Sequence, residues 1–443
     1  MPESNSSAAA KAGFFERWFR LSEHKTDFNT EILAGLVTFM TMAYVVIVHP
    51  AILSGAGMPT EPLVVVTAII TAASTILMAF YTNRPFALAP AMGSNAFFAY
   101  SIVATGHATW QQALGMVFIS GIVFLLLTLL GLREAIVNLV PRSIKVSVGA
   151  AVGLFIAELG FSNAGLITAS DNGLLGIGDL QQPEAILAII GFFLIATLMA
   201  LKIKGALLWG ILATTAIGIP MGITQLPSNL ISAPPSISSI AMQLDVMGAL
   251  KLAFIPLIFT FFAGDFFSTM GTLLGVGGKA GLLDENGDLP GIERPFLVDA
   301  LATTAGSLMG TSTVTTYIES AAGVEEGGRT GLTALVAGIA FALMVFFTPV
   351  AAMIPGAATA PALILIGLLM MPAINSIDFD DFTEALPAFI TIVFTAFTFN
   401  LANGISLGII TYVLVKLLSG RVSEIPVGLY FLCLPLLYYF YLL

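Results

Sequence analysis

Three carboxylates lie inside strongly apolar stretches of this sequence, where an ionisable side chain is costly and therefore indicates a function. Asp265 lies in the middle of a long apolar segment, Asp299 lies early in the next, and Glu319 follows a threonine-rich run. Buried acids can accept hydrogen bonds from a ligand and can exchange a proton. We expect Asp265 and Glu319 to serve a function. For Asp299, a structural tie between helices fits the sequence equally well.

The stretch from Gly310 to Gly331 reads as a helix that is broken at membrane depth. The threonines and valine between Thr311 and Thr316 favour an extended strand, and Tyr317 can begin a short helix with Glu319 in its first turn. Such a break persists inside a membrane only where protein or a cavity satisfies the backbone. The free N–H groups at the start of the half-helix then form a binding site with partial positive charge.

A similar break is expected nearer the N-terminus. Phe86–Pro90 reads as an extended segment and Ser94–Phe98 as the start of another half-helix. Phe97 and Phe98 of this half-helix, or Phe266 of the long apolar segment around Asp265, can stack on a planar ligand. Shifting the first half of the chain by about 222 positions lays this break on the other one, and seven spans per half make the two copies inverted. Both half-helix N-termini then point at the bilayer midplane, where transporters hold their substrates.

Composition defines the class of protein that must hold these elements. Of the 443 residues, 57% are hydrophobic and 9% are charged, and the mean hydropathy is +0.98. These values indicate an all-α polytopic membrane protein. Its expected surroundings are the lipid bilayer, and no nucleic-acid partner is expected. We expect about 14 spans, or one more if the last apolar run, Val427–Leu443, also crosses the bilayer. The single cysteine, Cys433, excludes an internal disulfide.

Basic residues define the orientation of the chain. With a cytoplasmic N-terminus, every Lys and Arg except Lys251 falls on the cytoplasmic side, Lys11 and Arg133 among them. We predict a cytoplasmic N-terminal segment over residues 1–29, a first inverted repeat over 30–235 and a second over 245–443.

Two other patterns are set aside. Gly275–Ala280 resembles a phosphate-binding loop but lacks the first glycine and the final Ser or Thr of that motif. His24, His49 and His107 have no spacing for a metal pair or a general base, and we expect no chemical role for them. No metal site and no organic cofactor are predicted, and a proton is the expected coupling ion.

Several motifs resemble a known family. They are Ala89–Tyr100, Gly271–Val276 followed by Lys279–Leu282, Gly310–Gly323 and Gly327–Thr333. They look like the adenine/guanine/hypoxanthine permease branch of the nucleobase–cation symporter family, and the likeness extends from Glu23 to Arg421.

The resemblance implies a uracil-permease-like fold of two seven-span inverted repeats, with short strands and half-helices in spans 3 and 10. Its core consists of spans 1–4 and 8–11 and its gate of spans 5–7 and 12–14. The resemblance also implies a homodimer in the plasma membrane, the inner membrane of a bacterium. The family's motif residues fall on Asn95, Phe97 or Phe98, Asp265, Asp299 and Glu319.

One departure from the family bears on the predicted site. Where the family usually has an acid, this chain has Ser268, and Asp265 lies three residues earlier on nearly the same helix face. We expect Asp265 to take over at least part of the role of that acid. The predicted substrate-binding residues are Glu319, Asp265, Asn95, Phe97, Phe98, Ser268, Thr269, Thr316, Tyr317 and Ser320, and the predicted proton-coupling residues are Asp265 and Asp299.

The chemistry of these residues favours a neutral purine. Glu319 and Asp265 can accept ring N–H groups, and half-helix N–H groups can donate to a C6 carbonyl, which favours guanine and hypoxanthine over adenine. We expect no Lys or Arg near the site, which argues against a permanently anionic substrate such as sulfate. An enzyme would need a nucleophile with its base or a metal cluster, and the sequence shows neither.

The predicted function is therefore proton-coupled uptake of purine bases by alternating access. The alternatives are an anion or uracil/xanthine transporter of the same fold, and a facilitator or channel without proton coupling.

Overall fold

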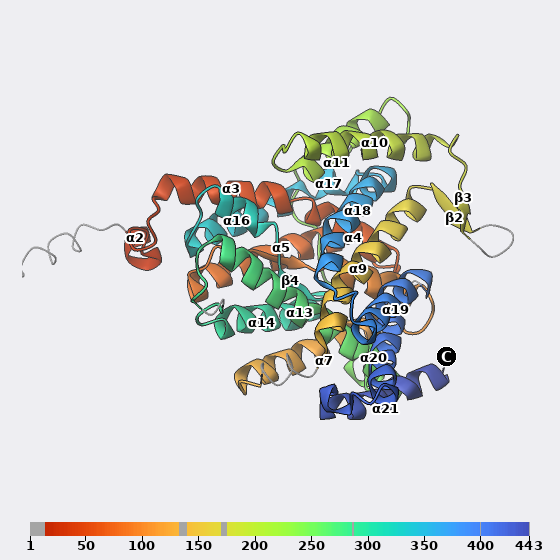
Figure 1. Ribbon diagram of the computed structural model, residues 1–443. Helices are drawn as coiled ribbons and strands as arrows, with labels where there is room; N and C mark the ends of the chain where they lie inside the picture. Colours follow the sequence, from red (N-terminus) through yellow and green to blue (C-terminus); the bar gives the residue numbers. More distant parts are fainter. Residues whose placement is uncertain (1–13, 133–139, 170–174, 286–287, 399, 443) are drawn as a thin grey trace, which may run out of the picture.

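The computed structural model describes residues 14–132, 140–169, 175–285, 288–398 and 400–442. Within these ranges the chain is almost entirely helical, with two short antiparallel strand pairs (Figure 1). Nine of the described helical segments are long and apolar enough to cross a membrane, so the protein is a multi-pass membrane protein. Lys11 and Arg133 of the charge analysis, and residues 1–13 of the predicted N-terminal segment, lie outside the described residues.

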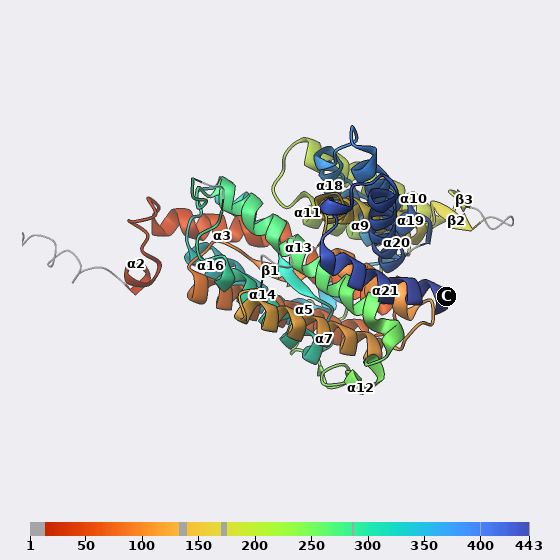
Figure 2. The same cartoon turned by 60° about the horizontal axis from the view of Figure 1, so that its bottom comes forward.

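Most of the helices pack into two bundles, which Figure 2 shows side by side. The first bundle consists of α3 (Phe28–Met42), α4 (Val45–Ser54), α5 (Thr60–Thr82), α6 (Met92–Ala96) with the π-helical η1 (Phe97–Val103), α7 (Trp110–Leu129), α13 (Ile255–Lys279), α14 (Glu293–Met309), α15 (Ser320–Glu325), α16 (Gly331–Met344) and α17 (Thr348–Ala352). The second consists of α9 (Arg142–Asn163), α10 (Pro183–Ala200), α11 (Ala206–Gly218), α18 (Gly356–Met370), α19 (Phe382–Thr398) and α20 (Leu401–Leu418).

The remaining elements lie at the edges of these bundles. They are α2 (Phe14–Phe19), the hairpin of β2 (Ile167–Ala169) and β3 (Leu175–Ile177), α12 (Val246–Ala249), the 3₁₀ turns η2 (Leu252–Phe254), η3 (Val345–Phe347), η4 (Met371–Ser376) and η5 (Val422–Glu424), and α21 (Val427–Leu442). Helix α21 contacts both α20 and α13 and therefore touches both bundles.

Two short strands pair inside the first bundle, and we call this pair the strand crossing. β1 (Leu88–Pro90) pairs antiparallel with β4 (Val314–Thr316), and all six residues are buried. The pairing extends by one backbone hydrogen bond at each end, from Ala91 N to Thr313 O and from Tyr317 N to Ala87 O, both 2.9 Å. The half-helix after each strand begins near this crossing. The sequence predicts that the half-helix after β4 begins at Tyr317. In the structure this half-helix, α15, begins three residues later, at Ser320.

Gly310 ends α14 in a conformation that suits only glycine. Its φ is +99°, in the left-handed region, and an added Cβ would lie 2.9 Å from the backbone oxygen of Ile240. The chain can therefore turn from α14 directly into β4.

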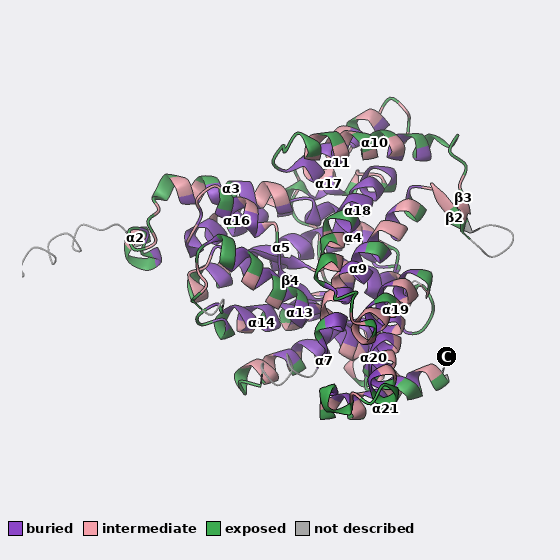
Figure 3. Cartoon of the chain, in the orientation of Figure 1, coloured by how far each residue is buried: buried purple, intermediate pink, exposed green. Residues whose placement is uncertain are grey.

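Exposed apolar side chains lie on the outer faces of peripheral helices (Figure 3). Phe193 on α10 is 65% exposed and Phe431 on α21 is 70% exposed. Such faces are favourable against lipid and costly against water, so their position agrees with a protein that is surrounded by a bilayer.

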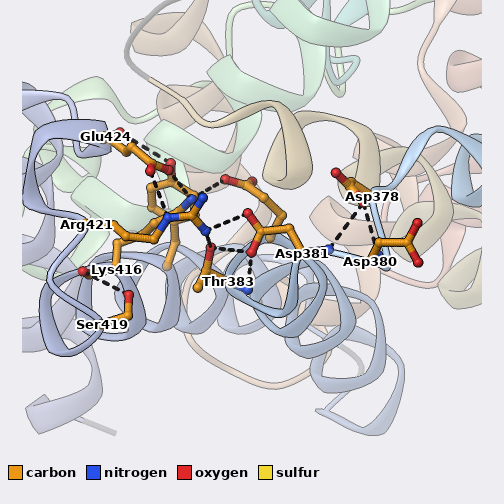
Figure 4. A network of polar contacts seen from close by, with 10 residues as sticks. Asp378, Asp380, Asp381, Thr383, Lys416, Ser419, Arg421 and Glu424 are labelled. Atoms are coloured by element: carbon orange, nitrogen blue, oxygen red, sulfur yellow. Dashed lines mark hydrogen bonds and ion pairs between the residues drawn. The ribbon is translucent and has the colours of Figure 1, made fainter.

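Ion pairs fix one end of the second bundle (Figure 4). Lys416 on α20 is 1% exposed, and its Nζ lies 2.9 Å from Oε1 of Glu384 and 2.5 Å from Oε2 of Glu424. A buried charge is tolerated only when it is paired, so these two acids hold α19, α20 and η5 together.

The same network continues outward to Arg421. Its Nη1 lies 2.6 Å from Oδ2 of Asp381, and its Nε lies 2.8 Å from Oε1 of Glu424. Hydrogen bonds from Thr383 and Arg421 lower the pKa of Asp381 to about 2. This carboxylate therefore stays charged, and the network intact, at any physiological pH.

Two adjacent acids at the end of α15, Glu325 and Glu326, pair with lysines from different bundles. Oε1 of Glu325 lies 2.7 Å from Nζ of Lys279, at the end of α13 in the first bundle. Glu326 forms an ion pair with Lys204, which lies between α10 and α11 in the second bundle. The second pair therefore joins the two bundles.

Glu31, in the first turn of α3, caps the start of α16. Its carboxylate is fully buried and accepts hydrogen bonds from the backbone N–H groups of Arg329 (2.8 Å), Thr330 (3.2 Å) and Thr333 (3.0 Å). The Thr333 hydroxyl donates a fourth at 2.6 Å. One side chain thus satisfies backbone donors that would otherwise be orphaned at a helix N-terminus.

We predict that Glu31→Ala destabilises the protein by about 3 kcal/mol, because several buried donors lose their acceptor together. The measurement is the thermal unfolding midpoint of the detergent-purified protein. Glu61→Ala, which removes an exposed acid from the first turn of α5, is the matched control. Equal midpoints for the two variants would contradict the capping role.

Candidate functional site

One face of α13 lies open beside the strand crossing. Gly264, Ser268, Gly271 and Gly275 share this face at helical spacing, and Ser268, Gly271 and Gly275 are exposed. An added Cβ on Gly271 would meet no atom within 4 Å, and one on Gly275 would meet only Ile318, at 3.7 Å. We call these four residues the open face of α13.

The open face is accessible from one end of the helix only. Leu257, Thr260 and Phe261 continue it toward the start of α13, and they are 2%, 1% and 1% exposed. Exposure therefore begins at Ser268 and extends toward Lys279. In this conformation the middle of α13 can be reached from the Lys279 end and is closed from the other.

Glu319 lies at the start of α15, beside this open face. It occupies the N-cap position of the half-helix and is only partly buried. Tyr44, at the junction of α3 and α4, donates a hydrogen bond of 2.6 Å to Glu319 Oε1. The carboxylate is thus oriented by one donor, while its other oxygen keeps its lone pairs for a ligand.

Asp265 does not face the same way as Ser268. It is 1% exposed, and its Oδ2 accepts a hydrogen bond of 2.7 Å from Thr303 on α14. A step of three residues rotates a helix by about 300°, leaving 60° between the two side chains, and Asp265 turns toward α14. In this conformation Asp265 therefore lies off the open face, and its taking over part of the role of the missing acid stays a prediction.

Asp299 lies fully buried in the same layer as Asp265. Its Oδ2 accepts from Thr269 on α13 at 2.7 Å and its Oδ1 from Thr316 on β4 at 3.1 Å. The Thr269 hydroxyl also lies 2.7 Å from that of Thr315. Asp299 therefore ties α13, α14 and β4 together behind the open face.

Several predicted contact residues hold the strand crossing together. Ser320 Oγ accepts from the N–H of Ala87 at 3.0 Å, and the Tyr317 hydroxyl donates to the carbonyl of Pro90. Asn95 accepts a hydrogen bond from Ser312. These side chains bridge the two broken segments, and in this conformation each forms a hydrogen bond with another group of the protein.

Phe97 and Phe98 are fully buried as well. The ring of Phe97 meets that of Phe261 edge-on, with 5.0 Å between centroids. Neither ring is available for stacking on a ligand in this conformation. Of the ten predicted binding residues, Ser268 and Glu319 are the two that are not buried.

One basic side chain of the second bundle approaches α13. Nζ of Lys145 on α9 lies 5.5 Å from the ring centroid of Phe267, the residue before Ser268. The sequence places these residues more than a hundred positions apart, so only the packing of the two bundles reveals the approach.

Sequence reasoning missed the role of Tyr44 and expected no chemical role for His49; both are buried polar residues of the first span. Tyr44 orients Glu319, and His49 Nε2 lies 2.8 Å from Oγ1 of Thr311, at the start of the second broken segment. His49 is fully buried, although the sequence gives it no chemical role. The missed signal is the one used for the acids, a polar side chain inside an apolar span.

Comparison with known proteins identifies the family. The family model Xan_ur_permease, described as a permease family, matches residues 29–407. The chain belongs to this permease family. It is 45% identical to a putative permease of Methanocaldococcus jannaschii (93% of this chain, 94% of that protein). It is 42% identical to the adenine permease AdeP of Escherichia coli (96% and 95%). It is 38% identical to the guanine/hypoxanthine permease PbuO of Bacillus subtilis (92% and 96%).

Solved structures confirm the fold of this permease. The transmembrane domain of a cyanobacterial bicarbonate transporter, BicA, superposes with a TM-score of 0.63 at 17% identity, over 87% of this chain and 97% of that one. The murine anion transporter Slc26a9 in its inward-facing state gives a TM-score of 0.66 at 10% identity, over 95% and 74%. At these identities the likeness concerns the fold alone.

We predict that the one-sided access is visible in chemical labelling. With Cys433 replaced by serine, Ser268→Cys should react with a hydrophilic maleimide about tenfold faster than Thr260→Cys, because only the first thiol is exposed. The two positions lie on one helix about 80° apart around its axis, Ser268 toward the open end and Thr260 toward the closed one. Equal labelling rates would show that position 268 is no more accessible to the reagent than position 260, which contradicts one-sided access.

Proposed function

We propose that this permease transports uncharged purine bases across the membrane by alternating access. The observation that carries the proposal is the Glu319 carboxylate, partly exposed at the start of a half-helix and next to a helix face that is open from one end only. A half-helix terminus inside the membrane is where secondary transporters bind their substrates. Relatives named adenine permease and guanine/hypoxanthine permease support a purine as the substrate.

We further propose about 14 membrane segments in two inverted seven-span repeats. Each proposed repeat contains one strand followed by one half-helix, and the two strands pair antiparallel, as inversion requires. The first bundle contains spans 1–4 and 8–11 of this scheme and the second contains spans 5–7 and 12–14, which supports a core moving against a gate. A cytoplasmic N-terminus, residence in a bacterial inner membrane and a homodimer remain predictions of this proposal.

The open face and Glu319 suit a neutral base with N–H donors. The free oxygen of Glu319 can accept a ring N–H, the Ser268 hydroxyl can donate or accept, and the glycines of α13 let a flat ring approach the backbone. Asp265 is then the candidate proton carrier, because its Oδ1 has no hydrogen-bond partner among the described residues. Its partner Thr303 also accepts a hydrogen bond of 3.0 Å from the N–H of Val314, so a change at Asp265 would reach β4.

The first test is uptake by proteoliposomes that contain the purified protein. We predict that labelled purine enters faster under an inward proton gradient and that a protonophore abolishes accumulation. Protein-free liposomes are the control. Transport that ignores the gradient would indicate a facilitator or channel, and uptake of uracil, xanthine or sulfate instead of purines would indicate the other transporters of this fold.

Competition decides which base is preferred. Half-helix donors suit a C6 carbonyl and therefore guanine or hypoxanthine, whereas the two adenine permeases, both 42% identical, are more similar to this chain than the 38% identical PbuO. We favour the oxopurines on the chemistry of the half-helix. Inhibition of labelled purine uptake by adenine at lower concentration than by hypoxanthine or guanine would reverse that choice.

Two substitutions separate binding from coupling. Glu319→Gln should weaken purine binding by roughly 2–5 kcal/mol, because a charged acceptor is lost from the contact with the base. Asp265→Asn should retain exchange of internal for external base but lose accumulation driven by a proton gradient. Glu325→Gln, which neutralises an exposed acid at the other end of the same half-helix, is the control.

Binding and transport assays on the same preparations check both assignments. Tight binding by Glu319→Gln would remove this residue from the site. Accumulation by Asp265→Asn would make Asp299 the leading proton carrier.

A further inference from the structure

A cavity of about 350 Å³ lies between the two bundles, away from the site described above. One wall is formed by the last turns of α4 and by Tyr100 of η1, and the other by Asn163 at the end of α9 and the first turns of α18. None of the lining residues belongs to the predicted substrate site. Known small-molecule sites have volumes of roughly 300–1,000 Å³, so the cavity is large enough for a small ligand.

The cavity lies at the end of the molecule where α13 is closed. The first span starts beside Arg329, near the end of α13 that carries Lys279. It is 27 residues long and ends at Ser54, which lines the cavity. A helix of that length covers about 40 Å. The cavity and the accessible end of the open face are therefore separated by the thickness of the membrane.

The lining defines the chemistry of the ligand. No lining side chain carries a charge, and Val48, Ile52 and Leu363 give the walls an apolar surface. Asn163 Nδ2 donates a hydrogen bond of 3.4 Å to the Tyr100 hydroxyl. This bond uses neither the hydroxyl proton of Tyr100 nor the side-chain carbonyl of Asn163. A ligand here meets both a donor and an acceptor beside an aromatic ring.

Two further hydroxyls offer acceptor lone pairs. Ser54 donates to the carbonyl of Ala51 at 2.8 Å and Thr359 to that of Gly356 at 3.1 Å, so each hydroxyl proton is already used. Their oxygens can still accept an N–H from a ligand. The lining thus suits an uncharged ring with several N–H groups and at least one ring nitrogen or carbonyl.

We propose that this cavity is a second, weaker binding site for a neutral nitrogen heterocycle of the proposed substrate's chemical class, a purine base. The inference rests on the proposed function for the identity of the ligand. Because its two walls belong to different bundles, an occupant contacts both, and a relative movement of the bundles changes or removes the site. The cavity would therefore hold a base in this conformation before that base reaches Glu319 in another.

Gly356 provides a selective way to block the cavity. An added Cβ at this position meets no atom within 4 Å, and its φ lies outside the left-handed region. A larger side chain can therefore enter the cavity without straining the backbone or displacing a neighbour. Gly356→Leu fills the space, and Gly356→Ala tests the effect of replacing the glycine itself.

The experiment is equilibrium binding of labelled hypoxanthine, guanine and adenine to the purified full-length protein. We expect two sites in the parent. Glu319→Gln should lose the tighter site and keep the weaker one, whereas Gly356→Leu should lose the weaker site and keep the tighter. Tyr100→Ala should weaken the second site by about tenfold, the effect of one aromatic contact, and Gly356→Ala should keep both.

The outcomes separate the two proposals. A single site in the parent that Glu319→Gln removes and Gly356→Leu leaves unchanged overturns the second site. A weaker site with unchanged affinity in both Gly356→Leu and Tyr100→Ala overturns it as well. Loss of both sites in Gly356→Leu, with the size-exclusion profile of the parent, also overturns it, because the cavity would then not be independent of Glu319. Binding that Gly356→Leu removes and Glu319→Gln leaves unchanged, with no tighter site at all, would refute the proposed function and leave the cavity site standing.

Discussion

The fold depends on the satisfaction of backbone hydrogen bonds at membrane depth. A lipid core offers no water to an unpaired N–H or C=O group, and each unsatisfied group costs several kcal/mol. The chain breaks two helices there, and the two extended pieces pair with each other as β1 and β4. Ser320 and Tyr317 complete the arrangement by bonding to Ala87 and Pro90. Each broken segment is therefore stable only in the presence of the other.

This mutual dependence divides the buried acids into two kinds. Asp299 is held by threonines of α13 and β4, and Asp265 by a threonine of α14 that also bonds to the backbone of β4. Glu319 is held by one tyrosine and remains partly exposed. The first two secure the crossing, and the third is available to a ligand. Burial and hydrogen-bond partners, rather than residue type, distinguish the two roles.

Much of this arrangement could be predicted from the sequence. The two breaks and the place of Glu319 at a half-helix terminus follow from threonine, glycine and acidic residues inside apolar spans. The direction of Asp265 could not be predicted, since the 60° between it and Ser268 matters only once the neighbouring helices are placed. The approach of Lys145 to Phe267 and the bond from Tyr44 to Glu319 join distant parts of the chain. No local pattern encodes contacts of that kind.

The two acids at the end of α15, Glu325 and Glu326, would be affected differently by a sliding motion of the bundles. If the bundles move past each other, Glu325 and Lys279 travel together within the first bundle, whereas Glu326 and Lys204 must separate. Separation requires electrostatic work, and dissolved salt reduces that work by screening partly exposed charges. Under the proposed alternating access, the balance between the two states is then coupled to the ionic strength of the solution around the Glu326–Lys204 pair. Glu325 and Glu326 are adjacent in the sequence, yet only the ion pair of Glu326 joins the two bundles and would respond to salt in this way.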